Sequence, residues 1–404
     1  MNIAVAQSGG PTCAINSSLL GVIKGALGSD KIDTIYGAVN GIEGIINQNL
    51  IDLTAASKEY DLELLRQTPS SALGSCRYKL PDFSKEPAVL QKIIDCFKAF
   101  GIEAFFYIGG NDSMDTVYKL SKHFMANGID IKVMGVPKTI DNDLCETDHT
   151  PGFGSAAKYV STTIKEVIRD SSVYDMKSVT IIEIMGRNAG WLTASACLLH
   201  KSEVAPHLIY LPECDFSLAK FISDIEKVQK THQSVIVALS EGVKISDANM
   251  STEGAAVDSF GHTMLGGVGK FLENEVKKAL GCKVRSIELN VMQRAGSHIS
   301  SLTDIDEAEK VGTAAVKAML KGETGKMMAF KRVSNDPYKV NIEPADASMV
   351  ANHEKMFPKE WINAEQNNIE DEAISYFAPL IMGEQNIKTE DGLPVHLVFK
   401  GLLK

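Results

Sequence analysis

Short apolar runs alternate with longer segments of helical periodicity along most of the chain. The apolar runs, rich in Val, Ile and Phe, predict strands, and the amphipathic segments between them predict helices. The expected strands are Ile3–Gln7, Thr34–Val39, Ala104–Ile108, Ile131–Val136, Val179–Ile184, Leu208–Leu211, Ser234–Leu239 and Val284–Leu289. The expected helices are Cys13–Leu27, Pro87–Phe100, Ser113–Met125, Ala156–Arg169, Gly190–Leu199, Ser217–Lys230, Gly267–Leu280 and Asp304–Leu320. Such alternation is typical of parallel sheets wrapped by helices, so we expect an α/β fold.

So many strands exceed one ordinary open sheet. We therefore expect two Rossmann-like lobes with parallel-rich sheets covered by helices, and a functional site between the lobes. The first lobe would cover residues 1–140 and the second 141–325, with the chain crossing back between lobes near 285–325. The proline-bearing residues 326–404 break the alternation and predict a C-terminal wrapping extension. The glycine-rich stretch 244–266 predicts a long functional loop.

Composition narrows the class of protein. The 404 residues are 44% hydrophobic and 23% charged, which is typical of a globular protein with a sizeable core. The 41 basic against 51 acidic residues give a net charge of −10, which argues against nucleic-acid or membrane partners. Seven cysteines without a C-x-x-C pair favour a reducing compartment. Neither a signal peptide nor a membrane span is recognisable, so we expect a soluble cytoplasmic protein.

Two glycine clusters follow predicted strands. Ser8-Gly9-Gly10-Pro11-Thr12 comes after the first strand and Gly109-Gly110-Asn111-Asp112-Ser113 after the third. Paired glycines let the backbone approach a phosphate, and the following helix turns its free N–H groups toward the anion. One such turn is as well explained by tight chain reversal, but two at the same predicted sheet edge favour a phosphate site.

The stretch Pro137-Lys138-Thr139-Ile140-Asp141-Asn142-Asp143-Leu144 follows the fourth strand and is the most specific of the chain. Two carboxylates beside a lysine can accept a proton and hold Mg²⁺ while the ammonium neutralises phosphoryl charge. The alternative is a polar turn in which Asp141 and Asp143 cap the backbone. The preceding buried strand and the two glycine clusters favour the chemical role.

Cationic and acidic clusters follow three further strands: Met185-Gly186-Arg187, Ser240-Glu241-Gly242 and Gln293-Arg294. Arginine matches phosphate oxygens with a planar fork of donors, and a carboxylate accepts sugar hydroxyls. Any one of them alone would be read as a solvated arginine or a loop cap. The histidines at 149, 207 and 298 lack metal-ligand spacing, and we treat them as surface or core residues.

Taken in order, these motifs resemble the phosphofructokinase family across about residues 1–320. Within it, Asp112 and Lys138 resemble the pyrophosphate-dependent branch, because ATP-using members typically carry glycine at both places. The later segments Asp258-Ser259-Phe260-Gly261-His262 and Trp361-Ile362-Asn363 also look like that branch.

The resemblance implies an enzyme: a phosphotransferase, or kinase, of glycolysis with Mg²⁺ as cofactor. It would move a phosphoryl group reversibly from pyrophosphate to the 1-hydroxyl of fructose 6-phosphate, giving fructose 1,6-bisphosphate and phosphate. The catalytic residues would be Asp141, which takes the proton, Lys138 and Asp112. The donor would bind Gly9, Gly10, Arg77, Gly110 and Ser113; the sugar phosphate Thr139, Ile140, Asp141, Met185, Gly186, Arg187, Glu241, Arg285 and Arg294; and the metal Asn111 and Asp143.

The resemblance also implies a homodimer or homotetramer, because some 6-phosphate ligands in the family come from a neighbouring subunit. The chain departs from the family at Asn111, where a metal-linked aspartate is usual, and at Ser178 and Val291, near the expected 6-phosphate. Lys177 could compensate for Ser178. The rival functions are an ATP-dependent 6-phosphofructokinase, an NAD kinase and a non-catalytic regulatory subunit.

Overall fold

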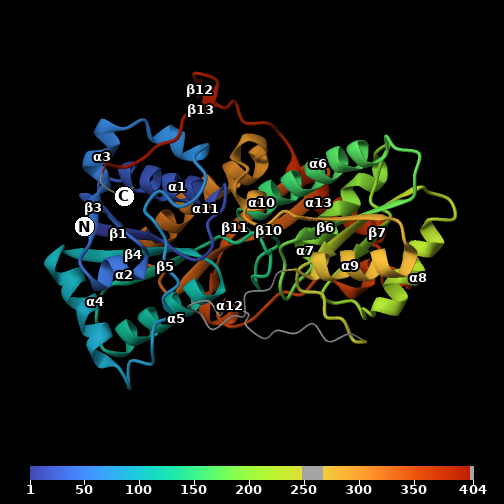
Figure 1. Cartoon of the computed structure of the whole chain (residues 1–404). Coiled ribbons are helices and arrows are strands. Elements are labelled where there is room, and N and C mark those ends of the chain that lie inside the picture. Colours follow the sequence, from blue (N-terminus) through green and yellow to red (C-terminus); the bar gives the residue numbers. More distant parts are fainter. Residues whose placement is uncertain (248–266, 401–404) are drawn as a thin grey trace.

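The computed structural model describes residues 1–247 and 267–400, and Figure 1 shows two α/β lobes side by side. The large sheet contains β1 (Asn2–Gln7), β2 (Thr34–Ala38), β3 (Leu50–Asp52), β4 (Ile102–Gly109), β5 (Lys132–Pro137), β10 (Lys326–Asn335) and β11 (Tyr338–Asp346) in the order β11-β10-β5-β4-β1-β2-β3. The small sheet contains β6 (Ser178–Ile184), β7 (Leu208–Tyr210), β8 (Ser234–Ser240) and β9 (Lys283–Glu288) in the order β7-β8-β6-β9. A separate antiparallel pair is formed by β12 (Thr389–Glu390) and β13 (Leu393–Pro394).

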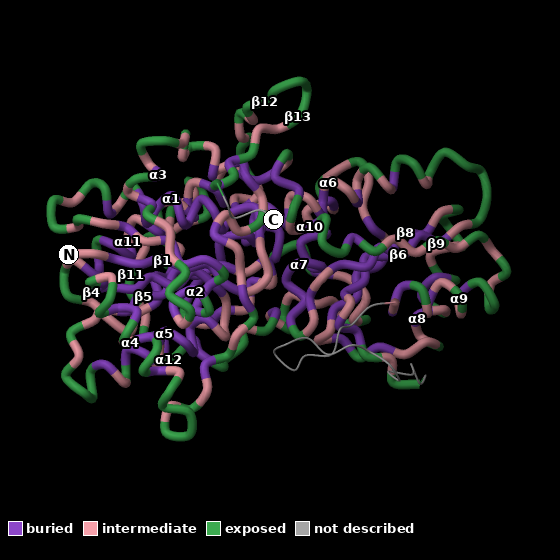
Figure 2. The backbone as a smooth tube through the Cα atoms, turned by 60° about the vertical axis from the view of Figure 1, so that its left-hand side comes forward, coloured by how far each residue is buried: buried purple, intermediate pink, exposed green. Residues whose placement is uncertain are grey.

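The helices cover both faces of each sheet. They are α1 (Ile15–Leu27), α2 (Ile42–Ile46), α3 (Leu53–Glu59), α4 (Pro87–Ala99), α5 (Asn111–Ala126), α6 (Phe153–Ser171), α7 (Trp191–Ala194), α8 (Leu218–Val228), α9 (Val268–Leu280), α10 (Met292–Ala295), α11 (Leu302–Leu320), α12 (Ala347–Val350) and α13 (Ile374–Phe377). Alternation of side chains along β1 sets the layers of the large lobe. Ile3 and Val5 pack with α1 and α11, while Ala4 and Ala6 pack with α2, α4 and α5. The central strands are accordingly buried on both faces (Figure 2).

The expected fold class is confirmed. Neighbouring strands pair in parallel throughout the small sheet, and only β3 and β11, at the two edges of the large sheet, pair antiparallel. Every strand and helix expected from the periodicity has a counterpart, with ends that differ by a few residues. The predicted helix Gly190–Leu199 is instead the short α7 followed by a 3₁₀ helix, Ser195–Lys201. Ser195 Oγ donates to Leu192 O at 2.6 Å, a local bond that competes with regular helix geometry.

The prediction of a wrapping extension from residue 326 was wrong for its first part. β10 pairs in parallel with β5, and β11 pairs antiparallel with β10, so residues 326–346 complete the large sheet. Pro344 had argued against a strand, but β11 is an edge strand, where a missing N–H is tolerated. Further on, the chain does run back over the large lobe: Leu397 N donates to Thr68 Oγ1 at 2.8 Å, and Phe399 joins the core beneath.

The remaining predictions concern the loop 244–266, two later segments and the absence of a membrane span. Of the expected loop 244–266, residues 248–266 lie outside the described residues, and so does the segment Asp258–His262. Trp361 is partly buried and packs edge-on against Trp191, a core residue of the small lobe, with ring centroids 6.2 Å apart. Within the described ranges no helix is long and apolar enough to cross a membrane.

Candidate active site

A cavity of about 620 Å³ lies where the carboxyl ends of β1, β4 and β5 face those of β6 and β8. It is lined by every site residue expected from the sequence except Gly186 and Arg285. Residues that the sequence did not single out also line it: Pro11, Thr12, Lys79, Asn188, Asn352 and Glu354. Pro11 and Thr12 belong to the first glycine cluster, and Asn188 adjoins Arg187. These three residues could therefore have been predicted as part of the site from the sequence. Asn352 and Glu354 carry no local signal.

The two glycine clusters are packed against each other. Ser8 Oγ and Ser113 Oγ lie 2.5 Å apart, which ties the loop after β1 to the first turn of α5. A Cβ on Gly109 would come 2.0 Å from Ser113 Oγ, so only glycine allows this contact. Gly9 has φ +74°, in the left-handed region that favours glycine. The cavity is therefore lined by backbone that can approach an anion closely.

Lys138, which follows β5, is hydrogen-bonded through its side chain to the first glycine cluster. Its side chain is buried, and Nζ donates to Ser8 O at 2.8 Å and to Gly10 O at 2.7 Å. Burial, together with the neighbouring Arg294, lowers the pKa of Lys138 to about 7. The ammonium is thus fixed beside the first glycine cluster. Because its pKa is about 7, a charged ligand would readily change its protonation state.

Asp141 and Asp143 both line the cavity, and Asn142 between them is turned away. Asn142 has φ +55° and donates from Nδ2 to Tyr376 Oη at 2.8 Å, which holds the turn between the two carboxylates. Burial raises the pKa of Asp141, although Lys138 counteracts it. Burial and the adjacent Asp141 raise the pKa of Asp143 to about 7. The two carboxyl groups therefore lie in the same buried environment, which favours binding of a proton or a cation.

The opposite wall is built after β6 and β8. Gly186 N donates to Glu241 Oε1 at 3.4 Å, and burial raises the pKa of Glu241 to about 7. Arg187 Nε is buried without a hydrogen-bond partner among the described residues. Gln293 Oε1 accepts from Met185 N at 3.2 Å. An unpaired buried donor beside a carboxylate is suited to a ligand that carries both anionic and hydroxyl groups.

Arg294 reaches the cavity from α10 and packs on the first glycine loop. A Cβ on Gly10 would lie 2.9 Å from Arg294 Nη1, so the glycine makes room for the guanidinium. Arg285 lies elsewhere: it is part of β9, and its Nη1 is 3.6 Å from Asp170 Oδ2. It shares a shallow hollow with Ser178, the first residue of β6, whereas the cavity is at the far end of that strand. Within one chain the two arginines do not come together.

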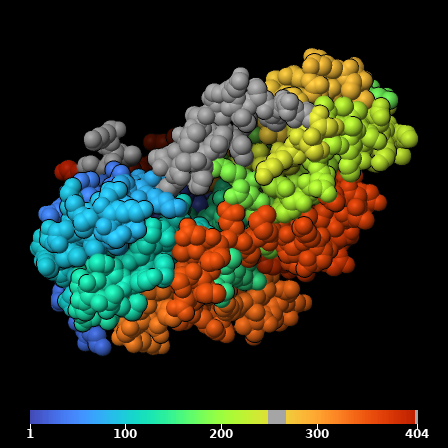
Figure 3. All heavy atoms as spheres, turned by 90° about the horizontal axis from the view of Figure 1, so that it is seen from below, coloured from blue at the N-terminus to red at the C-terminus, as the bar shows by residue number. Residues whose placement is uncertain are grey.

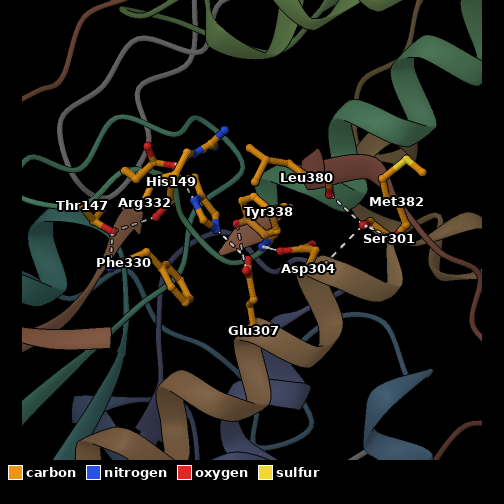
Figure 4. Close-up of polar contacts among 12 residues, drawn as sticks. Thr147, His149, Ser301, Asp304, Glu307, Phe330, Arg332, Tyr338, Leu380 and Met382 are labelled. Carbon is orange, nitrogen blue, oxygen red and sulfur yellow. Dashed lines mark hydrogen bonds and ion pairs between the residues drawn. The ribbon is translucent and has the colours of Figure 1, made fainter. Parts of the chain in front are cut away.

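A buried polar network fixes the loop that follows Asp143. His149 bonds two carboxylates, Asp148 through Nδ1 at 2.8 Å and Glu307 of α11 through Nε2 at 2.7 Å (Figure 4). Its ring stacks on Phe330 of β10 at 4.6 Å between centroids, and Arg332 also bonds Asp148. His149 is therefore a core residue, and the network anchors the loop to α11 and β10.

The cavity offers carboxylates to a metal ion, but its described residues do not form a complete set of metal ligands. No group of three or more His, Cys, Asp or Glu side chains that could hold a metal occurs in the described part of the chain. The Asn111 amide is engaged elsewhere, since Oδ1 accepts from Asn352 N at 2.6 Å and Nδ2 donates to Val350 O at 3.3 Å. Asp143 is thus the better placed of the two expected metal residues.

Known proteins share this architecture. Residues 2–319 match the family model described as phosphofructokinase. A relative from Halomonas elongata, named pyrophosphate--fructose 6-phosphate 1-phosphotransferase, is 40% identical over 97% of this chain and 94% of its own. One from Alkalicoccus urumqiensis, named sulfofructose kinase, is 35% identical over 90% and 92%. The crystal structure of a pyrophosphate-dependent phosphofructokinase from Nitrosospira multiformis is similar with a TM-score of 0.89, 37% identity and coverage of 99% and 96%. With glycine loops, acidic turn and arginine clusters around one cavity, and a matching model over most of its length, the chain belongs to the phosphofructokinase family.

Proposed function

We propose that the chain catalyses the reversible transfer of a phosphoryl group from pyrophosphate to the 1-hydroxyl of fructose 6-phosphate in the cytoplasm. The observation that carries this proposal is that Asp112 and Lys138, which point to pyrophosphate as donor, line the same cavity as Asp141. The name of the Halomonas relative, at 40% identity, supports the same donor and acceptor. The products are fructose 1,6-bisphosphate and phosphate.

The donor side binds pyrophosphate through backbone and cations. The residues assigned to it are Gly9, Gly10, Arg77, Gly110 and Ser113, with Lys138 beside the transferred group. Because Lys138 Nζ is already oriented by two carbonyls, it needs no reorganisation when charge develops on the phosphoryl oxygens. Catalysis then comes mainly from positioning and charge neutralisation.

The acceptor side orients the sugar phosphate for in-line attack. The residues assigned to it are Thr139, Ile140, Met185, Gly186, Arg187, Glu241 and Arg294. Asp141 accepts the proton of the 1-hydroxyl as its oxygen forms the new bond to phosphorus. The bond from phosphorus to the bridging oxygen breaks, and phosphate leaves with the electron pair. The raised pKa of Asp141 suits a base that must hold this proton.

We assign Arg285 to the 6-phosphate in the cavity of a neighbouring chain, so the active form is at least a homodimer. Exposed apolar side chains support this arrangement at both places. Val291 and Met292, close to Arg294 in sequence, are 49% and 52% exposed, and Tyr174, which lines the same hollow as Arg285, is 58% exposed. Exposed apolar side chains at two places on one chain can cover each other in a twofold dimer or in a tetramer.

Magnesium fits this site as a metal shared with the substrate. Mg²⁺ is commonly held by one or two carboxylates while substrate phosphates supply further ligands, and Asp143 offers such a carboxylate. When bound, the ion would neutralise charge on the pyrophosphate oxygens. Asp143 has its pKa raised to about 7, so a bound cation would favour its ionised form.

A donor comparison tests the proposal. The purified chain is given fructose 6-phosphate and Mg²⁺ with either pyrophosphate or ATP, and fructose 1,6-bisphosphate is measured. We expect turnover with pyrophosphate and little with ATP. Equal turnover with ATP would identify an ATP-dependent 6-phosphofructokinase instead, and no turnover with either donor would contradict the proposal.

The acceptor is tested in the same assay because a relative 35% identical is named sulfofructose kinase. A sulfonate carries one negative charge where a phosphate carries up to two. We expect fructose 6-phosphate to be preferred, because two arginines, Arg294 and the neighbouring chain's Arg285, are assigned to its terminal group. If kcat/KM were higher for sulfofructose than for fructose 6-phosphate, sulfofructose would be the preferred acceptor and the proposed acceptor would be wrong.

A further inference from the structure

The residues 350–355, which we call the strap, run along the cavity from outside the family match. The match ends at residue 319, yet Asn352 and Glu354 line the cavity. Figure 3 shows C-terminal segments, in orange and red, lying between the two lobes. The contacts of the strap reach both lobes.

On the donor side the strap is bonded to Asn111, the first residue of α5. Asn111 Oδ1 accepts from Asn352 N at 2.6 Å, and Asn111 Nδ2 donates to the carbonyls of Val350 and His353. Asn352 Nδ2 also donates to Asp115 Oδ1 at 3.1 Å. Position 111 thus requires one acceptor and one donor on the same planar group, which asparagine has and aspartate lacks.

In the middle the strap is bonded to the acidic turn. Lys355 N donates to Asp143 O at 2.7 Å, and Leu144 and Glu354 form an antiparallel bridge. On the sugar side Asn188 Nδ2 donates to Glu354 Oε1 at 2.8 Å, and Trp191 Nε1 donates to Lys355 O at 2.8 Å. Six residues therefore connect the donor segment, the acidic turn and the segment after β6.

We propose that the strap is an active-site element that fixes the donor half of the cavity against the sugar half, with Asn111 as its anchor and Glu354 as a positioning residue for Asn188. This rests on the proposed function, because it assigns the two halves to the two substrates. In-line transfer depends on the distance between the halves, and a misplacement of about 1 Å can cost roughly a hundredfold in rate. Among the described residues the side chain of Glu354 is hydrogen-bonded to Asn188 and not to Asp141 or Lys138, so we assign it a role through Asn188.

Two substitutions of Glu354 separate hydrogen bonding from charge. Glu354→Gln keeps an acceptor for Asn188, whereas Glu354→Ala removes it. We expect Glu354→Ala to lower kcat by about ten- to a hundredfold with each KM changed by less than about threefold, and Glu354→Gln to retain most of kcat. Glu360→Ala, an exposed carboxylate beyond the strap, is the matched control and should behave as wild type.

A double-mutant cycle with Asn188→Ala tests the coupling. If Glu354 acts through Asn188, the double variant is no slower than the slower single variant; losses that multiply would overturn the assignment. Loss of activity in Glu354→Gln equal to that in Glu354→Ala would also overturn it, since charge rather than position would then matter. For the anchor, Asn111→Asp should lose kcat at least as strongly as Asn111→Ala, and a fully active Asn111→Asp would contradict its role.

Hydrogen exchange provides a readout that does not depend on activity. Amides of the segment 185–191 should exchange faster in Glu354→Ala than in wild type and in Glu354→Gln, at unchanged global stability. Unchanged exchange there would overturn the strap proposal even if the enzyme is active. Absence of wild-type turnover with pyrophosphate, together with the expected exchange pattern, would instead overturn the proposed function and leave the strap as a tie between the lobes.

Discussion

Lys138 Nζ lies 2.7 Å from the carbonyl oxygen of Gly10, so the buried ammonium is oriented by the loop that it serves. Replacing Lys138 with methionine removes the cation at similar size. We expect kcat with pyrophosphate to fall by at least about a hundredfold, the loss typical of one preorganised electrostatic group. Steady-state kinetics measure it, and Lys79→Ala, which removes an exposed cation of the same cavity, is the control. A mild effect of Lys138→Met would exclude the role.

The pH dependence of Lys138 follows from its pKa of about 7. The lysine is protonated below that value and neutral above it, so kcat/KM for pyrophosphate should decline as the pH rises through about 7. Bound pyrophosphate favours the charged form, so the decline of kcat should lie at higher pH. If kcat and kcat/KM declined over the same pH range on the alkaline side, the assignment of this pKa to Lys138 would be contradicted.

Asp141 is predicted to be the general base. Asp141→Asn keeps the size of the side chain but cannot accept the proton, and base catalysis is worth about 10² to 10⁴ in rate. We expect kcat to fall within that range while KM for fructose 6-phosphate stays near normal. Initial rates over a range of sugar phosphate concentrations separate the two constants. Near-normal turnover would remove Asp141 from the mechanism.

Much of the cavity could be predicted because parallel strands bring their carboxyl ends to one edge. Ser8 and Lys138 each follow a buried strand and Gly109 ends one, and the structure places all three together. Arg285 and Arg294 are close in sequence, but one lies within β9 and the other after it, so proximity along the chain did not predict a shared place.

Other features depend on contacts between distant segments. Glu354 joins the cavity through Leu144 and Asn188, and nothing in its local sequence indicates those partners. Pro344 argued against the β10–β11 hairpin, and it is tolerated there because β11 is an edge strand. Edge position is a property of the whole sheet and cannot be read from nine residues alone.

Subunit complementation tests the assignment of Arg285 to a neighbouring chain. Arg285→Ala should raise KM for fructose 6-phosphate by roughly ten- to a hundredfold, the loss of one charge-assisted contact of about 1.5 to 3 kcal/mol. Arg294→Ala should act similarly, with KM for pyrophosphate little changed in both variants.

Mixing Arg285→Ala with Asp141→Asn chains then distinguishes the two arrangements. In a hybrid dimer the chain with intact Asp141 receives the intact Arg285 of its partner, so one of two sites is complete. We expect activity at low fructose 6-phosphate to return to about a quarter of the wild-type value when subunits exchange freely. If mixing restores nothing although subunits exchange, Arg285 acts in its own chain or in neither.

His149 is predicted to stabilise the fold in a pH-dependent manner. Burial alone would lower its pKa, but the carboxylates of Glu307 and Asp148 outweigh burial and raise it above 6.5. The folded state therefore binds the proton more tightly than the unfolded state, so the stabilisation is complete below pH 6.5 and is lost as the pH rises through the folded pKa.

Replacing this side chain tests the sign of that effect. His149→Gln removes a buried charged partner and should lower the free energy of unfolding by about 3 kcal/mol at pH 6. The difference from wild type should be smaller at pH 9 than at pH 6, because the wild type progressively loses this contribution as the pH rises above 6.5. Urea denaturation at both pH values measures it. A difference that is constant or grows with pH would contradict a protonated His149.

Asp112 is predicted to select pyrophosphate against ATP. It lies in the first turn of α5 at the cavity wall, with a side chain 30% exposed and Oδ1 3.5 Å from Lys79 Nζ. ATP with its transferable phosphate at the reaction centre must place its α-phosphate one phosphate further out, where the family resemblance puts residue 112. We expect the carboxylate to fill that space and repel a further anion, whereas pyrophosphate would end before it. Such a like-charge contact can cost several kcal/mol when desolvated.

Asp112→Gly removes both the bulk and the charge. We expect it to open measurable ATP binding and to weaken pyrophosphate use, with KM for fructose 6-phosphate nearly unchanged because Arg187 and Arg294 are untouched. Asp112→Asn separates the two causes, since it keeps the bulk and removes the charge. If only the glycine variant binds ATP, steric exclusion dominates; if both do, repulsion dominates. ATP turnover by the unmodified chain as fast as with pyrophosphate, at equal Mg²⁺, would show that Asp112 does not select the donor.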